Sequence, residues 1–128
     1  MPIDYTIDRH EGLILTVAVG TLTDEDIVDM KRRLLADPDY DPGMKELSDI
    51  RGVDDFQVTA AGISRFVGID EVKSEVVKDH LLAIVASRDV IYGMARMYQS
   101  QTQSFKPGVE IFRTMEEARE WLGLPSQD

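Results

Sequence analysis

Six consecutive apolar residues, Leu81-Leu82-Ala83-Ile84-Val85-Ala86, decide the fold class of this chain. A run of this length without a polar residue is typical of a central strand that is covered on both faces. A polar residue, Ser87, follows the run, and apolar residues recur at helical spacing from Ile91 to Tyr98. A covered strand followed by an amphipathic helix indicates one unit of an α/β fold with parallel strands.

Four further strands are expected on either side of this run. Residues 3–8 alternate apolar and polar side chains, and residues 13–19 are apolar except for one threonine, so the two segments predict a hairpin. Residues 44–50 and 109–112 predict two more strands that alternate with helices along the chain. The sequence therefore predicts a five-stranded, mostly parallel sheet with an antiparallel edge strand.

The predicted helices are recognised by their N-terminal caps. Acidic residues follow the first of these caps, where the helix dipole favours anions. The apolar residues of the second helix change face, so we expect a kink near Gly68 to Asp70. The third helix is expected to lose its regular structure in the polar residues 99–104. The four helices begin at Thr23, Thr59, Asp89 and Thr114 and the element order is β-β-α-β-α-β-α-β-α.

Composition limits the classes of function. The 128 residues include 14 Lys and Arg against 24 Asp and Glu, which gives a formal net charge of -10, so nucleic acids and anionic membrane surfaces are unfavourable partners. There is no cysteine, no apolar run near the ~20 residues that span a bilayer, and no secretory signal pattern. We expect one cytoplasmic domain over residues 1–124, a polar tail over 125–128, and no membrane insertion.

The chain resembles the STAS-like domains, which have the SpoIIAA-like fold, and is most similar to small bacterial SpoIIAA-like proteins of largely unassigned function. The likeness extends over nearly the whole chain and implies the same element order. The segments that carry it are residues 48–56, 83–86, 91–99, 109–113, 116–118 and 121–122.

One motif of that family is altered. The STAS proteins that antagonise anti-sigma factors carry an Asp-Ser-Ser-Gly or Asp-Ser-Thr-Gly motif. The second hydroxyl residue of this motif is phosphorylated. The matching stretch is Asp49-Ile50-Arg51-Gly52, so Arg51 stands in place of the phosphoacceptor. The resemblance therefore implies a regulatory or interaction module that lacks the phosphorylated serine or threonine.

Arginines gather where the predicted strands end. Ligands of open α/β sheets bind at the carboxyl ends of the strands, and Arg51, Arg88 and Arg113 follow three of them. These cations predict either a rim that binds a small anion or a partner carboxylate, or, as the favoured alternative, pairs with local carboxylates. The candidate rim residues are Asp49, Arg51, Gly52, Arg88, Asp89 and Arg113.

The third predicted helix carries methionine and tyrosine on more than one face. Such residues, with arginine, are enriched at protein interfaces, but they also fill cores. Both interpretations are equally open here. The candidate interface or pocket residues are Tyr92, Met94, Arg96, Met97 and Tyr98, with Gln99 beside them.

No catalytic or metal-binding constellation is found. His10 and His80 have no second histidine or nucleophile at motif spacing, and we interpret both as surface residues. The alternating Asp37, Asp39 and Asp41 do not make a calcium loop, because Pro42 stands where that loop needs glycine. We therefore expect no metal and no cofactor.

These patterns lead to an ordered set of functional hypotheses. The first is a non-enzymatic module that binds a protein partner or a second copy of itself. The second is a binder of a small anionic or lipid-like ligand, with Phe56, Phe66, Tyr92 and Met94 lining a pocket and Arg51 and Arg88 at its mouth. An enzyme that uses Asp49 or Asp89 as a general base is the weakest hypothesis.

Overall fold

A computed structural model describes residues 2–125 of the chain. The predicted order of strands and helices is confirmed, with one short additional helix before the fourth strand. The elements are β1 Ile3–Asp8, β2 Leu13–Thr23, α1 Asp24–Ala36, β3 Lys45–Gln57, α2 Ala60–Val72, α3 Ser74–Val77, β4 Leu81–Val85, α4 Asp89–Thr102, β5 Val109–Phe112 and α5 Met115–Leu122.

The strands form a five-stranded sheet in the order β1-β2-β3-β4-β5. The edge strand β1 runs antiparallel to β2, as the hairpin predicted, and the remaining neighbours are parallel. The apolar run lies in β4, where Ile84 pairs with Ser48 of β3 and Ile111 of β5. The expectation of a mostly parallel sheet with one antiparallel edge is therefore confirmed.

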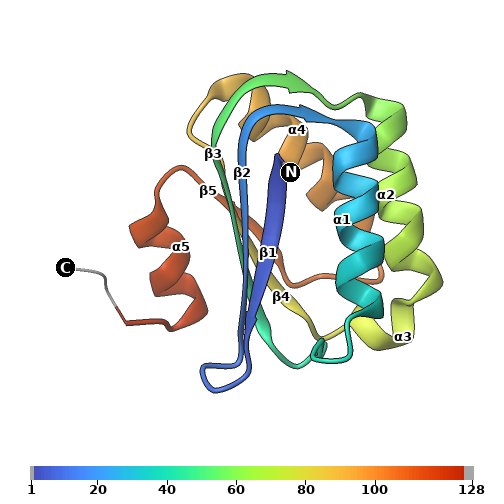
Figure 1. Cartoon of the computed structure of the whole chain (residues 1–128), viewed down its shortest axis with the longest axis vertical. Helices are drawn as coiled ribbons and strands as arrows, with labels where there is room; N and C mark the ends of the chain where they lie inside the picture. The colour runs from blue at the N-terminus through green and yellow to red at the C-terminus, as the bar shows by residue number, and fades with distance from the viewer. Residues whose placement is uncertain (1, 126–128) are drawn as a thin grey trace.

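Helices cover both faces of the sheet unequally (Figure 1). The helices α1, α2 and α4 pack on one face, and α5 lies on the other. The strand β4 contributes Leu82 and Ile84 to the larger core under α1, α2 and α4, and Ala83 and Val85 to the smaller core under α5. This two-sided cover explains why β4 is apolar at successive positions.

The predicted strand over residues 44–50 is too short. The observed β3 has 13 residues and ends at Gln57, and β2 likewise continues to Thr23. The extra length pairs β2 with β3 beyond the end of β4, where polar side chains such as Asp54 and Asp55 are exposed. One face of the extension packs on the larger core through Leu22 and Val53, but consecutive polar residues interrupt the alternation in the sequence, so apolar periodicity does not detect it.

The helices α2 and α4 also differ from the prediction. The break falls at Lys73, between α2 and α3, and α2 continues through Gly68 to Val72. The apolar stripe of α2 is interrupted in the sequence because one inward position of the helix is a charged residue, Asp70, which is buried. The helix α4 extends to Thr102 through polar residues that make inward contacts, since the Gln99 amide donates to the backbone oxygen of Val109.

A cap at the start of α2 joins it to α1. The Asp24 carboxylate accepts hydrogen bonds from the backbone N–H and the hydroxyl of Thr59, each at 2.7 Å. Thr59 in turn caps α2 by accepting from the backbone N–H of Gly62. A Cβ atom at Gly62 would overlap with the Asp24 carboxylate, so a larger residue there would displace that carboxylate from its hydrogen bonds with Thr59.

Candidate functional site

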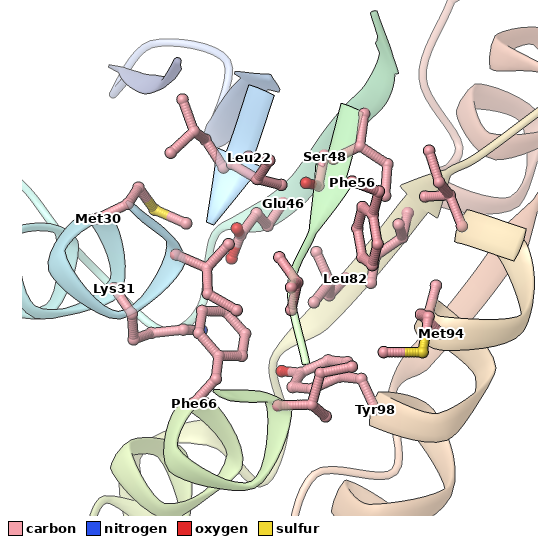
Figure 2. Close-up of a pocket in the computed structure, with 18 residues that line it drawn as sticks. Leu22, Met30, Lys31, Glu46, Ser48, Phe56, Phe66, Leu82, Met94 and Tyr98 are labelled. Carbon is pink, nitrogen blue, oxygen red and sulfur yellow. The ribbon is translucent and has the colours of Figure 1, made fainter. Parts of the chain in front are cut away.

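A cavity of about 90 Å³ lies between the sheet and the helices α1, α2 and α4. It is partly open to solvent, and its lining is mostly apolar (Figure 2). Leu22, Phe56 and Leu82 line it from the sheet, and Phe66 and Met94 line it from α2 and α4. A space lined in this way suits an apolar molecule.

Charged side chains are buried at one end of this helix-covered layer. Each belongs to a different segment of the chain, and each is at most 3% exposed. Ionised groups are almost never fully buried unless they are paired, so their convergence is a specific structural feature. We call this set the buried ion cluster: Lys31 of α1, Glu46 of β3, Asp70 of α2, His80 before β4, and Lys106 between α4 and β5.

Asp70 is the centre of the cluster. Its Oδ2 lies 3.1 Å from the Lys106 Nζ and accepts a 2.9 Å hydrogen bond from the Tyr98 hydroxyl, and its Oδ1 lies 3.2 Å from the Lys31 Nζ. The Lys31 contact is Coulombic, since Oδ1 has no well-aligned hydrogen bond. Burial alone would raise the pKa of Asp70, but the two ammonium groups and the Tyr98 hydroxyl lower that pKa to about 2.

Glu46 and His80 form the second pair. The His80 Nε2 lies 2.9 Å from Oε1 of Glu46, and its Nδ1 lies 3.1 Å from the backbone oxygen of Pro42. Burial opposes ionisation of Glu46, but the His80 hydrogen bond and the charge on Lys31 lower the pKa of Glu46 to about 2. The carbonyl and the carboxylate both accept, so the two ring nitrogens of His80 face acceptors from two different segments of the chain.

The two lysines respond differently to burial. Burial and the neighbouring charge of Lys31 lower the pKa of Lys106 to about 8, although Asp70 and Glu46 oppose this. Burial also disfavours the charge on Lys31, but Asp70 and Glu46 outweigh it and raise the pKa of Lys31. Lys31 is further stabilised by the Phe66 ring, whose centroid lies 4.7 Å from Nζ.

Three polar residues, Lys31, Glu46 and Ser48, join the apolar residues in the lining of the cavity. Tyr98, whose hydroxyl donates to Asp70 of the cluster, lines it as well. Figure 2 shows Glu46, Lys31 and Ser48 around the same space. The second carboxylate oxygen of Glu46 and the Ser48 hydroxyl make no hydrogen bond to any residue in the range 2–125. The cavity therefore combines an apolar body with polar atoms that have unused hydrogen-bonding capacity.

The predicted arginine rim is occupied by local contacts. Arg51 pairs with Asp49 through two hydrogen bonds of 2.9 Å, and both lie within β3 rather than after it, because β3 is longer than predicted. Arg88 donates to the backbone oxygens of Val53 and Asp54. The Arg51–Asp49 contact is the local pairing with a carboxylate that the sequence favoured. Binding of a small anion or a partner carboxylate by the rim stays a prediction.

The remaining rim residues also contact their neighbours. Arg113, rather than the adjacent Arg88, pairs with Asp89 at 2.7 Å, and it also donates to the backbone oxygen of Ser87. A Cβ at Gly52 would lie 2.8 Å from Cγ1 of Val19, which indicates that glycine is needed where β3 approaches β2. These contacts leave the three arginines at separate positions along the edge.

The candidate residues on α4 divide between the interior and the surface. Met94 lines the cavity, Tyr98 is buried beside the ion cluster, and Met97 is half-buried against the core. Arg96 is exposed. Tyr92 is not part of the lining of this cavity, because its ring stacks on the guanidinium of Arg113, 4.0 Å from the ring centroid, and its place in an interface stays a prediction.

Sequence reasoning missed the buried ion cluster. The interpretation of His80 as a surface residue is wrong, since His80 is 1% exposed. One available signal was Glu46, a carboxylate inside the predicted strand over residues 44–50, and another was Asp70 at the point where the apolar stripe of the second helix broke. Each signal alone is as compatible with an exposed residue as with a buried one.

The sheet order, its antiparallel edge and the unequal helix layers define a SpoIIAA-like fold. The fold expected from the resemblance to STAS-like domains is thus confirmed. A similar solved structure is the crystal structure of an uncharacterized protein of the DUF3478 family with a SpoIIAA-like fold from Shewanella loihica PV-4. The likeness covers 94% of this chain and 93% of that chain with a TM-score of 0.59 and 22% identity.

A likeness at this identity establishes the fold and leaves the activity open. No family model matches the sequence, and no curated protein matches it. Within residues 2–125, no helix is both long and apolar enough to cross a membrane, and no group of three or more potential ligand side chains is placed to hold a metal ion.

Proposed function

We propose that this chain is a non-enzymatic module that binds a small apolar ligand in the cavity between the sheet and the helices α1, α2 and α4. The observation that supports this most directly is the 90 Å³ space with its mostly apolar lining. An apolar cavity of about 150 Å³ in another protein takes up benzene. A ligand of one ring or a short alkyl chain therefore suits the present cavity, with its open side accommodating any excess length.

The cavity has an energetic cost that a ligand would offset. Native interiors contain few voids larger than a water molecule. Atoms that line such a space have no packing partners on its side, so they lose van der Waals contacts. A ligand that fills the space recovers contacts with its lining, so binding and a rise in stability are expected together.

The electrostatics of the site favour binding over catalysis. A general base works best with a pKa near the working pH, whereas the pKa values of Glu46 and Asp70 are both lowered to about 2. The pKa of Asp49, one of the two predicted general bases, is also lowered, chiefly by its hydrogen bond from Arg51. Three candidate carboxylates are thus weak bases held by cations.

The test is thermal denaturation with and without toluene, repeated on a variant with a filled cavity. Ala95 lines the cavity and is buried, so Ala95→Leu places additional carbons in the space. The matched control is Ala61→Leu, at an exposed position of α2. Toluene should raise Tm in the original chain and in the control, and leave Tm of Ala95→Leu unchanged. Equal responses of all three proteins would contradict binding in this cavity.

The interaction module that the sequence placed first is the second candidate. It is favoured by two exposed valines of β2, Val17 at 40% and Val19 at 53% exposure, which share a strand face with Leu15 of the smaller core under α5. Light scattering over a range of concentrations tests association with a second copy. A dimer that Val19→Thr converts to monomer would support it, and a monomer at all concentrations would contradict it.

A further inference from the structure

The polar end of the cavity contains an incompletely satisfied carboxylate. Glu46 is 3% exposed and lines the cavity, and its Oε1 is paired with His80. Within residues 2–125, its other oxygen accepts no hydrogen bond. This oxygen is not among the side-chain atoms that are cut off from solvent without a partner, so water or a ligand group that enters the cavity can donate a hydrogen bond to it.

A donor with spare capacity lines the same space. The Lys31 ammonium carries three N–H groups, and its one charged partner among the described residues is Asp70. Lys31 is close enough to Glu46 for its charge to lower the pKa of that carboxyl. The cavity therefore presents an acceptor with negative charge and a donor with positive charge to whatever molecule enters it.

These two groups discriminate among the polar groups of a ligand. A ligand carboxylate would pair with Lys31 but be repelled by Glu46, and a ligand ammonium would meet the reverse conflict. An apolar molecule would leave both groups unsatisfied. A hydroxyl is a donor and an acceptor at once, so it can donate to Glu46 and accept from Lys31 or Ser48.

We propose that the ligand is a small neutral alcohol or phenol whose hydroxyl donates to the Glu46 carboxylate while its hydrocarbon part occupies the apolar cavity. This inference rests on the proposed function and specifies the class of ligand. Hydrogen bonds to charged groups are stronger than those between neutral groups, so the hydroxyl supplies selectivity as well as affinity.

The test is calorimetric titration at pH 7 with phenol, toluene and benzoate, which share one ring and differ in the attached group. Phenol should bind about tenfold more tightly than toluene, and benzoate should bind more weakly than phenol. Toluene or benzoate binding as tightly as phenol would overturn the inference and leave the proposed function intact. Binding of neither phenol nor toluene would overturn both, and would indicate that only water enters the cavity.

Variants locate the selectivity at Glu46. Glu46→Gln removes the negative charge but retains the shape, so the preference for phenol over toluene should fall at least threefold and benzoate should bind more tightly. Glu120→Gln is the matched control, because it makes the same change at an exposed position of α5, which packs on the opposite face of the sheet. An unchanged preference in Glu46→Gln would contradict the inference. The comparison of ligands on the original chain decides the matter even if Glu46→Gln does not fold.

Discussion

Asp70 of α2 and Lys106, 36 residues further along the chain, meet at 3.1 Å in the interior. Both side chains are at most 1% exposed. Their contact ties the end of α2 to the segment between α4 and β5, and Lys31 brings α1 to the same carboxylate. This arrangement makes the cluster a junction of the three helices around the cavity, and it leads to the first of four predictions on stability.

Replacing Asp70 with asparagine should destabilise the protein strongly. The variant leaves two buried ammonium groups without their shared carboxylate, and breaking a buried pair in this way costs roughly 3–5 kcal/mol. Urea denaturation measures the change in the free energy of unfolding. Asp79→Asn, at an exposed position in the same part of the chain, should have almost no effect. A loss below ~1 kcal/mol in Asp70→Asn would show that the cluster is not a structural junction.

Acid should weaken the fold through the buried carboxylates. The pKa of Glu46 is lowered from 4.5 to about 2, and that of Asp70 from 3.8 to about 2. A lowered pKa in the folded state means that the unfolded chain binds protons first, so the stabilisation is present above about pH 4.5 and is lost as the pH falls toward 2.

Urea midpoints measured between pH 6 and pH 2 check the acid prediction. The midpoint should fall across this range in the original chain and should fall less steeply in Glu46→Gln, which has one titrating carboxyl fewer. Parallel curves for the two proteins would mean that Glu46 does not contribute to the pH dependence.

Gly62→Ala should destabilise the junction between α1 and α2. The added methyl would overlap with the Asp24 carboxylate, which is held by two hydrogen bonds from Thr59, so strain of roughly 1–3 kcal/mol is expected. Gly68 lies in the same helix with open space around it. Gly68→Ala should therefore stabilise by roughly 0.5–1 kcal/mol, and thermal denaturation of both variants should show shifts of opposite sign.

His80→Ala should be far more damaging than His10→Ala. Removal of the buried ring leaves the Glu46 carboxylate unpaired and opens a void beside it, for an expected loss of about 3 kcal/mol. His10 is exposed in the hairpin turn, so its removal should change stability by less than about 0.5 kcal/mol. Chemical denaturation of the two variants would contradict the structure if their losses were similar.

Several local features were predictable because their signals are local. The caps Thr23, Thr59 and Thr114 lie where their side chains meet the first turn of each helix, and β5 has the expected bounds. Short-range periodicity and capping chemistry depend on neighbours within a few positions. The apolar strand β4 was recognised for the same reason.

The candidate site was only partly predictable. Phe56, Phe66 and Met94 line the cavity as expected, whereas Tyr92 and the arginines are engaged elsewhere. Lys31, Glu46 and His80 resemble ordinary polar residues in the sequence. Their partners lie between 34 and 39 positions away, since Glu46 is 34 residues from His80 and Asp70 (position 70) is 39 residues from Lys31 (position 31).

The sequence by itself determined the order of strands and helices, because apolar periodicity and helix caps act through residues that are close along the chain. It also determined the absence of cysteine chemistry and the net charge of -10. Only the tertiary structure decided which charges are buried and which arginines are occupied. A charged residue is stable inside a protein when a counter-charge reaches it, and that depends on which distant segments the fold brings together.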